Sequence, residues 1–134
     1  MNKRILIVDD EFGLADVVAE ILTDQGYETS IAINGRLGLA QLAEKPPSLV
    51  LLDVMMPVLD GPTTLLAMRA HPDFATIPVI MMTALPEALP KTDPPLFQAV
   101  LYKPFTIEGL NSAVARLIGP SAENGASRAG GSKT

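Results

Sequence analysis

The most constraining feature of this chain is a run of apolar residues, Leu49–Leu52, that ends directly in the carboxylate of Asp53. Because no polar residue interrupts the run, it predicts a strand that is covered on both faces. Pro57 follows soon after Asp53, and Asp60-Gly61 then marks a turn. Asp53 is therefore expected at the carboxyl end of a central parallel strand, where open α/β sheets bind their ligands.

The same pattern, an apolar run that ends in a polar residue, occurs three more times. The runs are Ile5–Val8, Val79–Met82 and Ala99–Tyr102, and they lead into Asp9-Asp10-Glu11, Thr83 and Lys103-Pro104. Each run predicts a strand that ends beside a side chain able to bind a cation or a phosphate. If the strands are parallel, these side chains lie along one edge of the sheet.

Composition indicates one globular domain, because 134 residues with 48% apolar side chains are enough for a single core and too few for two. No apolar run approaches the ~20 residues of a membrane helix, and the amino end lacks the apolar segment of about 7–15 residues that secretory signals need. The chain has no Cys, which excludes disulfides and thiolate metal sites and fits a cytoplasmic location. A net charge of −5 argues against direct nucleic-acid binding, and no membrane contact is expected.

Helical periodicity, together with start and stop signals, predicts four helices along the chain. The first begins near Glu11 or Phe12, the second follows Asn34 as N-cap, the third runs from about Pro62 to Ala70, and the last starts at the N-cap Thr106 and ends at Gly119-Pro120. The residues expected to face the core are Leu14, Val17, Val18, Ile21, Leu22, Leu39, Leu42, Leu65, Met68, Ile107, Leu110, Val114 and Leu117. The alternating residues 27–33 predict a half-exposed edge strand.

Strands that alternate with helices predict a parallel sheet with helices on both faces. The chain also resembles the CheY-like receiver domain of response regulators in two-component signalling systems. The matching motifs are Asp9-Asp10, the run LLDVMMPVLDG around Asp53, Thr83-Ala84 and Tyr102-Lys103-Pro104, and the resemblance covers about residues 3–118. It implies a flavodoxin-like, doubly wound α/β fold with five parallel strands in the order 2-1-3-4-5. This order brings Asp9, Asp10 and Asp53 together.

Two segments depart from a regular pattern. The family normally has a helix between its fourth and fifth strands, but here residues 85–98 contain Pro86, Pro90, Pro94 and Pro95. Since a proline inside a helix costs roughly 3 kcal/mol, at most one turn near 86–90 is expected, followed by an extended loop. Residues 1–119 are expected to form the receiver domain, and 120–134 are expected to be a flexible tail or linker because they have almost no large apolar side chain.

The resemblance implies a metal site and a phosphoacceptor. Three neighbouring carboxylates repel one another, by about 4 kcal/mol per pair at ~4 Å, so an ionised cluster calls for a cation. Oxygen ligands suit Mg²⁺, with Mn²⁺ as a second possibility. By resemblance, Asp10, Asp53 and the backbone carbonyl of Met55 bind the metal directly, and Asp9 acts partly through water. Asp53 is then the residue that accepts a phosphoryl group.

The resemblance also implies the residues that bind the phosphoryl group and switch the domain. Lys103 and the Thr83 hydroxyl bind phosphoryl oxygens, the small Ala84 leaves room for the donor, and Tyr102 turns inward after phosphorylation. The Lys103-Pro104 peptide bond is expected to be cis. The residues two after the acceptor and two after the threonine, Met55 and Leu85, are apolar and cannot orient a hydrolytic water, which predicts a long-lived phosphoryl group.

The function expected is that of a response regulator: Asp53 accepts a phosphoryl group from a histidine kinase or a phosphotransfer protein, and the domain changes its affinity for a downstream protein. It is not expected to be an enzyme beyond its own phosphorylation and dephosphorylation. One alternative is a phosphorylation-independent interaction module on the same fold, suggested by the prolines in 86–95. Another is a haloacid-dehalogenase-like phosphohydrolase, although the D-x-D motif of that family has no counterpart in Asp9-Asp10-Glu11. The sequence leaves open whether the domain stands alone or belongs to a longer protein.

Overall fold

The sheet has the expected strand order. The computed structural model describes residues 3–120, and within them five strands form one parallel sheet in the order β2-β1-β3-β4-β5. The strands are β1 (Arg4–Val8), β2 (Glu28–Ala32), β3 (Leu49–Asp53), β4 (Val79–Thr83) and β5 (Ala99–Tyr102). The fold-class prediction is therefore confirmed, including the position of residues 28–32 as an edge strand. The proposed tail lies almost entirely outside the described residues.

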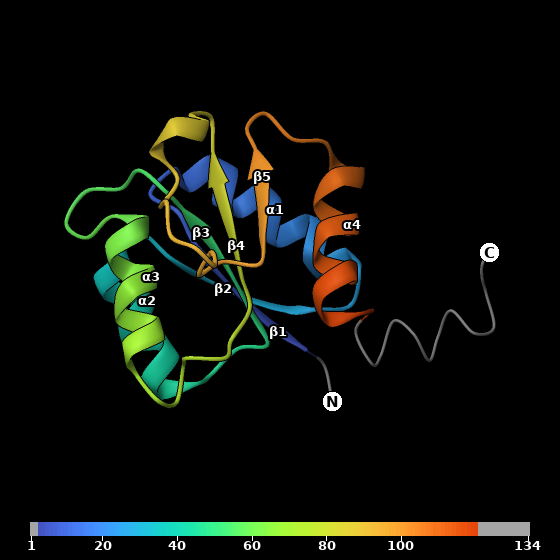
Figure 1. Cartoon of the computed structure of the whole chain (residues 1–134). Helices are drawn as coiled ribbons and strands as arrows, with labels where there is room; N and C mark the ends of the chain where they lie inside the picture. Colours follow the sequence, from blue (N-terminus) through green and yellow to red (C-terminus); the bar gives the residue numbers. More distant parts are fainter. Residues whose placement is uncertain (1–2, 121–134) are drawn as a thin grey trace.

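Four α-helices cover the two faces of the sheet. They are α1 (Phe12–Asp24), α2 (Gly35–Glu44), α3 (Gly61–Ala70) and α4 (Ile107–Ile118). Figure 1 shows α1 and α4 on one face and α2 and α3 on the other, so the domain has three layers. No helix in residues 3–120 is long and apolar enough to cross a membrane.

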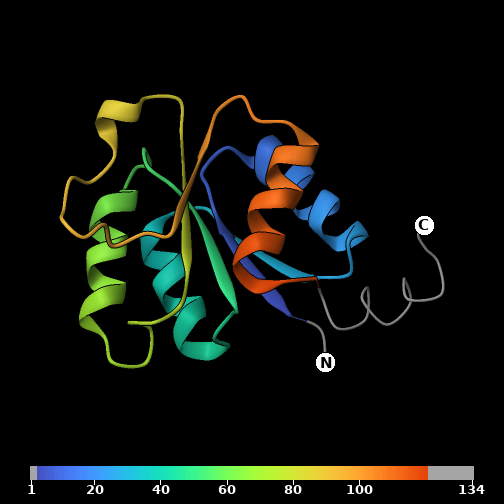
Figure 2. The ribbon, with the colours of Figure 1, turned by 45° about the vertical axis from the view of Figure 1, so that its right-hand side comes forward.

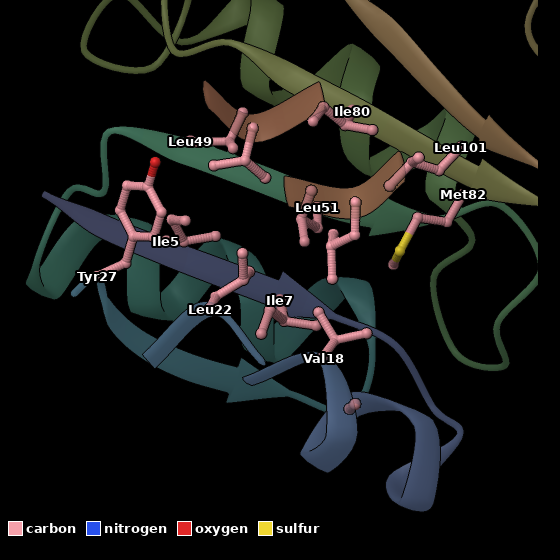
Figure 3. Packing of buried hydrophobic residues seen from close by; sticks show 13 residues of the cluster. Ile5, Ile7, Val18, Leu22, Tyr27, Leu49, Leu51, Ile80, Met82 and Leu101 are labelled. Carbon is pink, nitrogen blue, oxygen red and sulfur yellow. The ribbon is translucent and has the colours of Figure 1, made fainter. Parts of the chain in front are cut away.

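Each face of the sheet has its own core because successive side chains of a strand point to opposite faces. In β1, Ile5 and Ile7 pack with α1 and α4, whereas Leu6 and Val8 pack on the α2 and α3 side. Figure 3 shows the first of these cores, where Val18 and Leu22 of α1 lie against residues of the central strands. Strands β3 and β4 are buried along their whole length, as their unbroken apolar runs predict.

Two of the residues expected to be buried, Val17 and Ile107, are exposed instead. Val17 is 51% exposed because the stripe of α1 that faces the sheet passes through Ala15, Val18 and Leu22, and Val17 lies to one side of it. Ile107 is 62% exposed in the first turn of α4, before the helix reaches the buried positions of its stripe. Ile33 is also exposed, because β2 ends one residue before it.

Side-chain caps begin three of the helices. The side chains of Asn34, Asp60 and Thr106 each accept a hydrogen bond of 2.8 Å from the backbone N–H three residues further on. Gly119 ends α4 with φ = 73°, a conformation that favours glycine. The caps expected at Asn34 and Thr106 are confirmed, and Asp60 is a further one.

The segment between β4 and β5 contains one short helical turn, η1 (Pro86–Ala88), and no α-helix. Residues 89–98 continue as an irregular strap that returns to β5 beside α3 (Figure 2). Arg69 of α3 holds the end of this strap: its Nε donates to the carbonyl of Leu96 at 2.9 Å, and its Nη2 donates to Oε1 of Gln98 at 3.1 Å. The predicted loss of the helix to prolines is therefore confirmed.

Candidate functional site

Polar side chains gather at the carboxyl ends of four strands. Asp9 and Asp10 follow β1, Asp53 is the last residue of β3, Thr83 is the last of β4, and Lys103 follows β5. A pocket of about 310 Å³ lies among them, lined by Asp10, Glu11, Asp53, Met55, Thr83, Ala84, Leu85 and Lys103. This lining contains most of the residues that the sequence assigns to a site.

Three carboxylates form the acidic part of the site. Oxygens of Asp9, Asp10 and Asp53 all lie within 4.8 Å of one another. Asp9 and Asp53 are buried, whereas Asp10 is exposed and faces the solvent side of the cluster. Such a set of hard oxygen donors, two of them fixed by burial, is suited to a divalent cation of the Mg²⁺ or Mn²⁺ type.

The most buried of these carboxylates, Asp9, also organises the backbone around it. Its side chain is 1% exposed, and its Oδ1 accepts a hydrogen bond of 2.9 Å from the N–H of Glu11. The Asp9 N–H donates to the carbonyl of Ala32 at 3.0 Å. Asp9 therefore fixes the start of the chain segment that leads into α1.

Lys103 neutralises part of this negative charge. Its Nζ lies 3.1 Å from Oδ1 of Asp53, 2.9 Å from Oε1 of Glu11 and 3.5 Å from Oδ2 of Asp9. The contact with Glu11 was not expected from the sequence, which assigned that residue no function. The position of Glu11 directly after Asp9-Asp10 is the sequence feature that could have indicated a role at the site. Glu11 thus ties Lys103 to the amino end of α1.

The environment shifts the pKa of both members of the central ion pair. Burial, followed by the charge of Asp9, raises the pKa of Asp53 from 3.8 to about 6, although Lys103 acts in the opposite direction. Burial alone lowers the pKa of Lys103, but the hydrogen bond to Glu11 and the charges of Asp53 and Asp9 outweigh it and raise that pKa to about 12. Lys103 is therefore a permanent cation, whereas Asp53 is a carboxylate that its surroundings destabilise.

Thr83 is hydrogen-bonded to Leu85, the residue just before the η1 turn. Its hydroxyl accepts a hydrogen bond of 2.9 Å from the N–H of Leu85 and donates one of 3.2 Å to the Leu85 carbonyl. Thr83 itself is 3% exposed. The hydroxyl at the pocket is thus linked to the backbone of the segment between β4 and β5.

Tyr102, the residue expected to turn inward as a switch, faces solvent in this structure. It is 51% exposed and does not line the pocket. Met55 lines it with a side chain that is 61% exposed. The Lys103–Pro104 peptide bond is cis, as expected.

Gly61 allows the chain after β3 to close over Asp53. A Cβ at Gly61 would clash with the backbone carbonyl of Asp53 and lie 2.8 Å from the Cα of Val54. The Gly61 N–H donates to the carbonyl of Val54 at 2.9 Å. The absence of a side chain at Gly61 therefore lets α3 begin directly against the end of β3.

Fold and site together define the class of protein. The model of the family "Response regulator receiver domain" matches residues 5–115. The chain therefore belongs to the response regulator receiver family and is a receiver domain of two-component signalling. The two alternative classes considered from the sequence are not favoured by this match.

Curated relatives include proteins of very different length. The chain is 35% identical over 120 residues to sporulation initiation phosphotransferase F of Bacillus subtilis, which covers 88% of this chain and 95% of that protein. It is 39% identical over 118 residues to the regulatory protein AtoC of Escherichia coli, which covers 87% of this chain but only 25% of AtoC. The chain thus spans a quarter of the length of one relative and nearly all of the other.

Solved structures give the same assignment. The chemotaxis protein CheY4 of Vibrio cholerae superposes with a TM-score of 0.81 at 29% identity, covering 87% of this chain and 99% of CheY4. The receiver domain of the sensor histidine kinase PA1611 of Pseudomonas aeruginosa superposes with a TM-score of 0.77 at 26% identity, covering 89% of this chain and 99% of that domain. The PA1611 receiver domain was solved with a magnesium ion coordinated in its active site cleft.

Proposed function

We propose that Asp53 accepts a phosphoryl group from a phosphohistidine of a histidine kinase or phosphotransfer protein, with Mg²⁺ as cofactor, and that this changes the affinity of the domain for a protein partner. The position of Asp53 is the main support for this function. Its carboxylate opens into a pocket between two further aspartates and a lysine whose Nζ is 3.1 Å away.

In the transfer, an oxygen of the Asp53 carboxylate attacks phosphorus, and the bond from phosphorus to the histidine nitrogen breaks. The nitrogen keeps the electron pair, and Asp53 becomes an acyl phosphate. Lys103, a permanent cation beside Asp53, stabilises negative charge on one phosphoryl oxygen, and the Thr83 hydroxyl donates to another. The small side chain of Ala84 at the pocket leaves space for the donor.

Asp9, Asp10 and Asp53 are the residues that fit a divalent cation, and we assign Mg²⁺ to them, with the backbone carbonyl of Met55 as a further ligand and Mn²⁺ as a substitute. The magnesium ion in the active site cleft of the PA1611 receiver domain supports this choice. When bound, the metal offsets the repulsion between the three carboxylates and an incoming phosphoryl group.

Phosphorylation adds charge and acceptor oxygens at Asp53, and the change reaches the surface through Thr83. A hydroxyl has one hydrogen, so Thr83 cannot donate both to the phosphoryl group and to the Leu85 carbonyl. Tyr102 then turns inward. Its exposed side chain in this structure corresponds to the state before that turn.

The domain works as a switch rather than as an enzyme with an external substrate, and we place it in the cytoplasm with protein partners. Its acidic net charge of −5 disfavours contact with DNA by this domain. The match covers only a quarter of AtoC but nearly all of sporulation initiation phosphotransferase F, so the output of the whole protein stays open.

The first experiment is intact mass spectrometry after incubation with acetyl phosphate, with and without Mg²⁺. One added phosphoryl group on the wild-type chain, lost in Asp53→Asn and without metal, is the expected result. An adduct that persists in Asp53→Asn would move the acceptor to another residue. No adduct despite measured Mg²⁺ binding would favour a phosphorylation-independent interaction module.

A further inference from the structure

A second pocket, apolar in character, lies beside the acidic one. It has a volume of about 550 Å³ and is formed by the loop after β3 and by the η1 turn. The residues that matter for its chemistry are Met55, Met56, Pro57, Asp60, Leu85 and Ala88. Met55 and Leu85 line both pockets, so they form a shared wall between them.

The segment after β4 that lines the apolar pocket forms no regular helix. The η1 turn has no buried residue, and the strap after it is irregular. Met55 is 61% exposed and Leu85 is 43% exposed, although both are large apolar side chains. Exposed apolar side chains that gather around a concave surface are typical of a protein interaction site.

Acidic side chains predominate at this pocket and the one beside it. Within the described residues, Asp60 is the only charged residue that lines the apolar pocket. Glu87 of η1 is exposed and adjoins the lining residue Ala88 in sequence. The adjoining acidic pocket adds Asp10 and Glu11, while its one cation, Lys103, is already paired with three carboxylates. This surface repels nucleic acids and anionic lipids and attracts basic groups.

Thr83 couples the shared wall to the chemistry at Asp53. Both of its side-chain hydrogen bonds go to the backbone of Leu85. The far end of the strap is fixed to α3, since Arg69 binds the carbonyl of Leu96 and the side chain of Gln98. A loss of the Thr83 bond therefore changes the segment from Leu85 up to the strap end and leaves β5 in place.

We propose that the apolar pocket is a docking site for a partner-protein segment that inserts an apolar side chain and carries lysine or arginine beside it. The inference rests on the proposed phosphorylation of Asp53, which tightens this docking. The phosphoryl group adds negative charge next to the shared wall, and the release of Leu85 by Thr83 lets the wall adjust to the inserted side chain.

The test uses two synthetic amphipathic peptides of about 18 residues with the same leucine face, one flanked by lysines and the other by glutamates. Binding is measured by fluorescence anisotropy, and the methyl NMR signals of Met55 and Met56 report where the peptide binds. Leu85→Glu places a charge in the pocket wall. Val17→Glu is the matched control, because Val17 is a similarly exposed apolar residue on α1, at the opposite face of the sheet (Figure 1).

The lysine peptide is expected to bind at least about tenfold more tightly than the glutamate peptide and to shift both methionine signals. Leu85→Glu should abolish this binding and Val17→Glu should not. Beryllofluoride, a mimic of the acyl phosphate, should tighten it by about fivefold or more. Equal binding of the two peptides, or equal effects of the two variants, would overturn the docking site even where mass spectrometry shows normal phosphorylation of Asp53. Binding that beryllofluoride leaves unchanged would overturn the coupling.

Discussion

The two neighbouring pockets share Met55 and Leu85 but are built on different parts of the fold. The ionisable groups of the acidic pocket stand at or next to strand ends, and three carboxylates fix its lysine. The apolar pocket is formed by a loop and a single helical turn with no buried residue. The sheet register thus fixes the chemistry of the acidic pocket, whereas the docking surface lies on connections that can change without disturbing the sheet.

Lys103→Met is the variant expected to distinguish the functions of the two pockets most clearly. Loss of the Lys103 cation beside Asp53 is expected to reduce the rate of phosphorylation by acetyl phosphate by about 100-fold, because developing charge on the phosphoryl group loses its donor. Binding of the lysine peptide without phosphorylation should persist, since Lys103 does not line the apolar pocket. The rate is measured by intact mass over time.

Lys91→Met is the control for this variant, because Lys91 lies exposed in the strap. A similar loss of rate in both variants would mean that overall charge, rather than the position of Lys103, determines the reaction. A Lys103→Met variant that still takes up phosphate at the normal rate would contradict the role given to this lysine.

The second test concerns the cost of keeping Asp53 ionised. Its pKa rises from 3.8 to about 6 on folding, so between these values the folded state keeps a proton that the unfolded state has lost. Stability therefore falls as pH rises through this window, by up to about 2–3 kcal/mol above pH 6. Asp53→Asn should raise the free energy of unfolding by a similar amount at pH 7.5 without divalent cations, measured by urea unfolding.

The gain from Asp53→Asn should disappear below about pH 4, where Asp53 is protonated in both states. Asp16→Asn, an exposed position on α1, should show no such gain. A gain that is independent of pH would point to improved packing instead of relief from charge repulsion.

The strand ends were predictable from the sequence because each apolar run is unbroken and stops at a polar residue. This is why Asp53, Thr83 and Lys103 could be assigned to one edge, with the strand order supplied by the family resemblance. The caps at Asn34 and Thr106 were also local enough to predict.

Features that depend on tertiary packing were not predictable. Val17 and Ile107 are as apolar as the residues that are buried, and only the docked helices show which stripe faces the sheet. The pair of Glu11 with Lys103 joins residues that are 92 positions apart and depends on how α1 begins. The shape of the apolar pocket depends on the path of the irregular segment after β4, and no periodic sequence pattern predicts that path.

A third test addresses the shared wall through Met55→Asn. The apolar Met55 cannot orient a water molecule toward an acyl phosphate, whereas an amide can, so this variant is expected to lose its phosphoryl group about tenfold faster. Decay of the mass adduct is followed after removal of the donor. Met56→Asn is the matched control, because Met56 lines only the apolar pocket. Fast decay in the wild type, unchanged in Met55→Asn, would reject the predicted long lifetime.

The smallest expected effect concerns the loop that forms one side of the apolar pocket. Val58 has φ = 71°, and a β-branched residue in this left-handed conformation is strained by about 1–2 kcal/mol. Val58→Gly should therefore raise the free energy of unfolding by up to about 1 kcal/mol, after the greater entropy of glycine in the unfolded chain is subtracted. Val58→Ala keeps the Cβ and should change it little. The Val58 side chain is exposed and lines neither pocket, so phosphorylation of Val58→Gly should be unaffected. The looser loop of this variant should weaken binding of the lysine peptide a few-fold. If Val58→Gly leaves both stability and peptide binding unchanged, the strained loop has no part in shaping the docking surface, and the difference between the two pockets depends on Leu85 and the η1 turn alone.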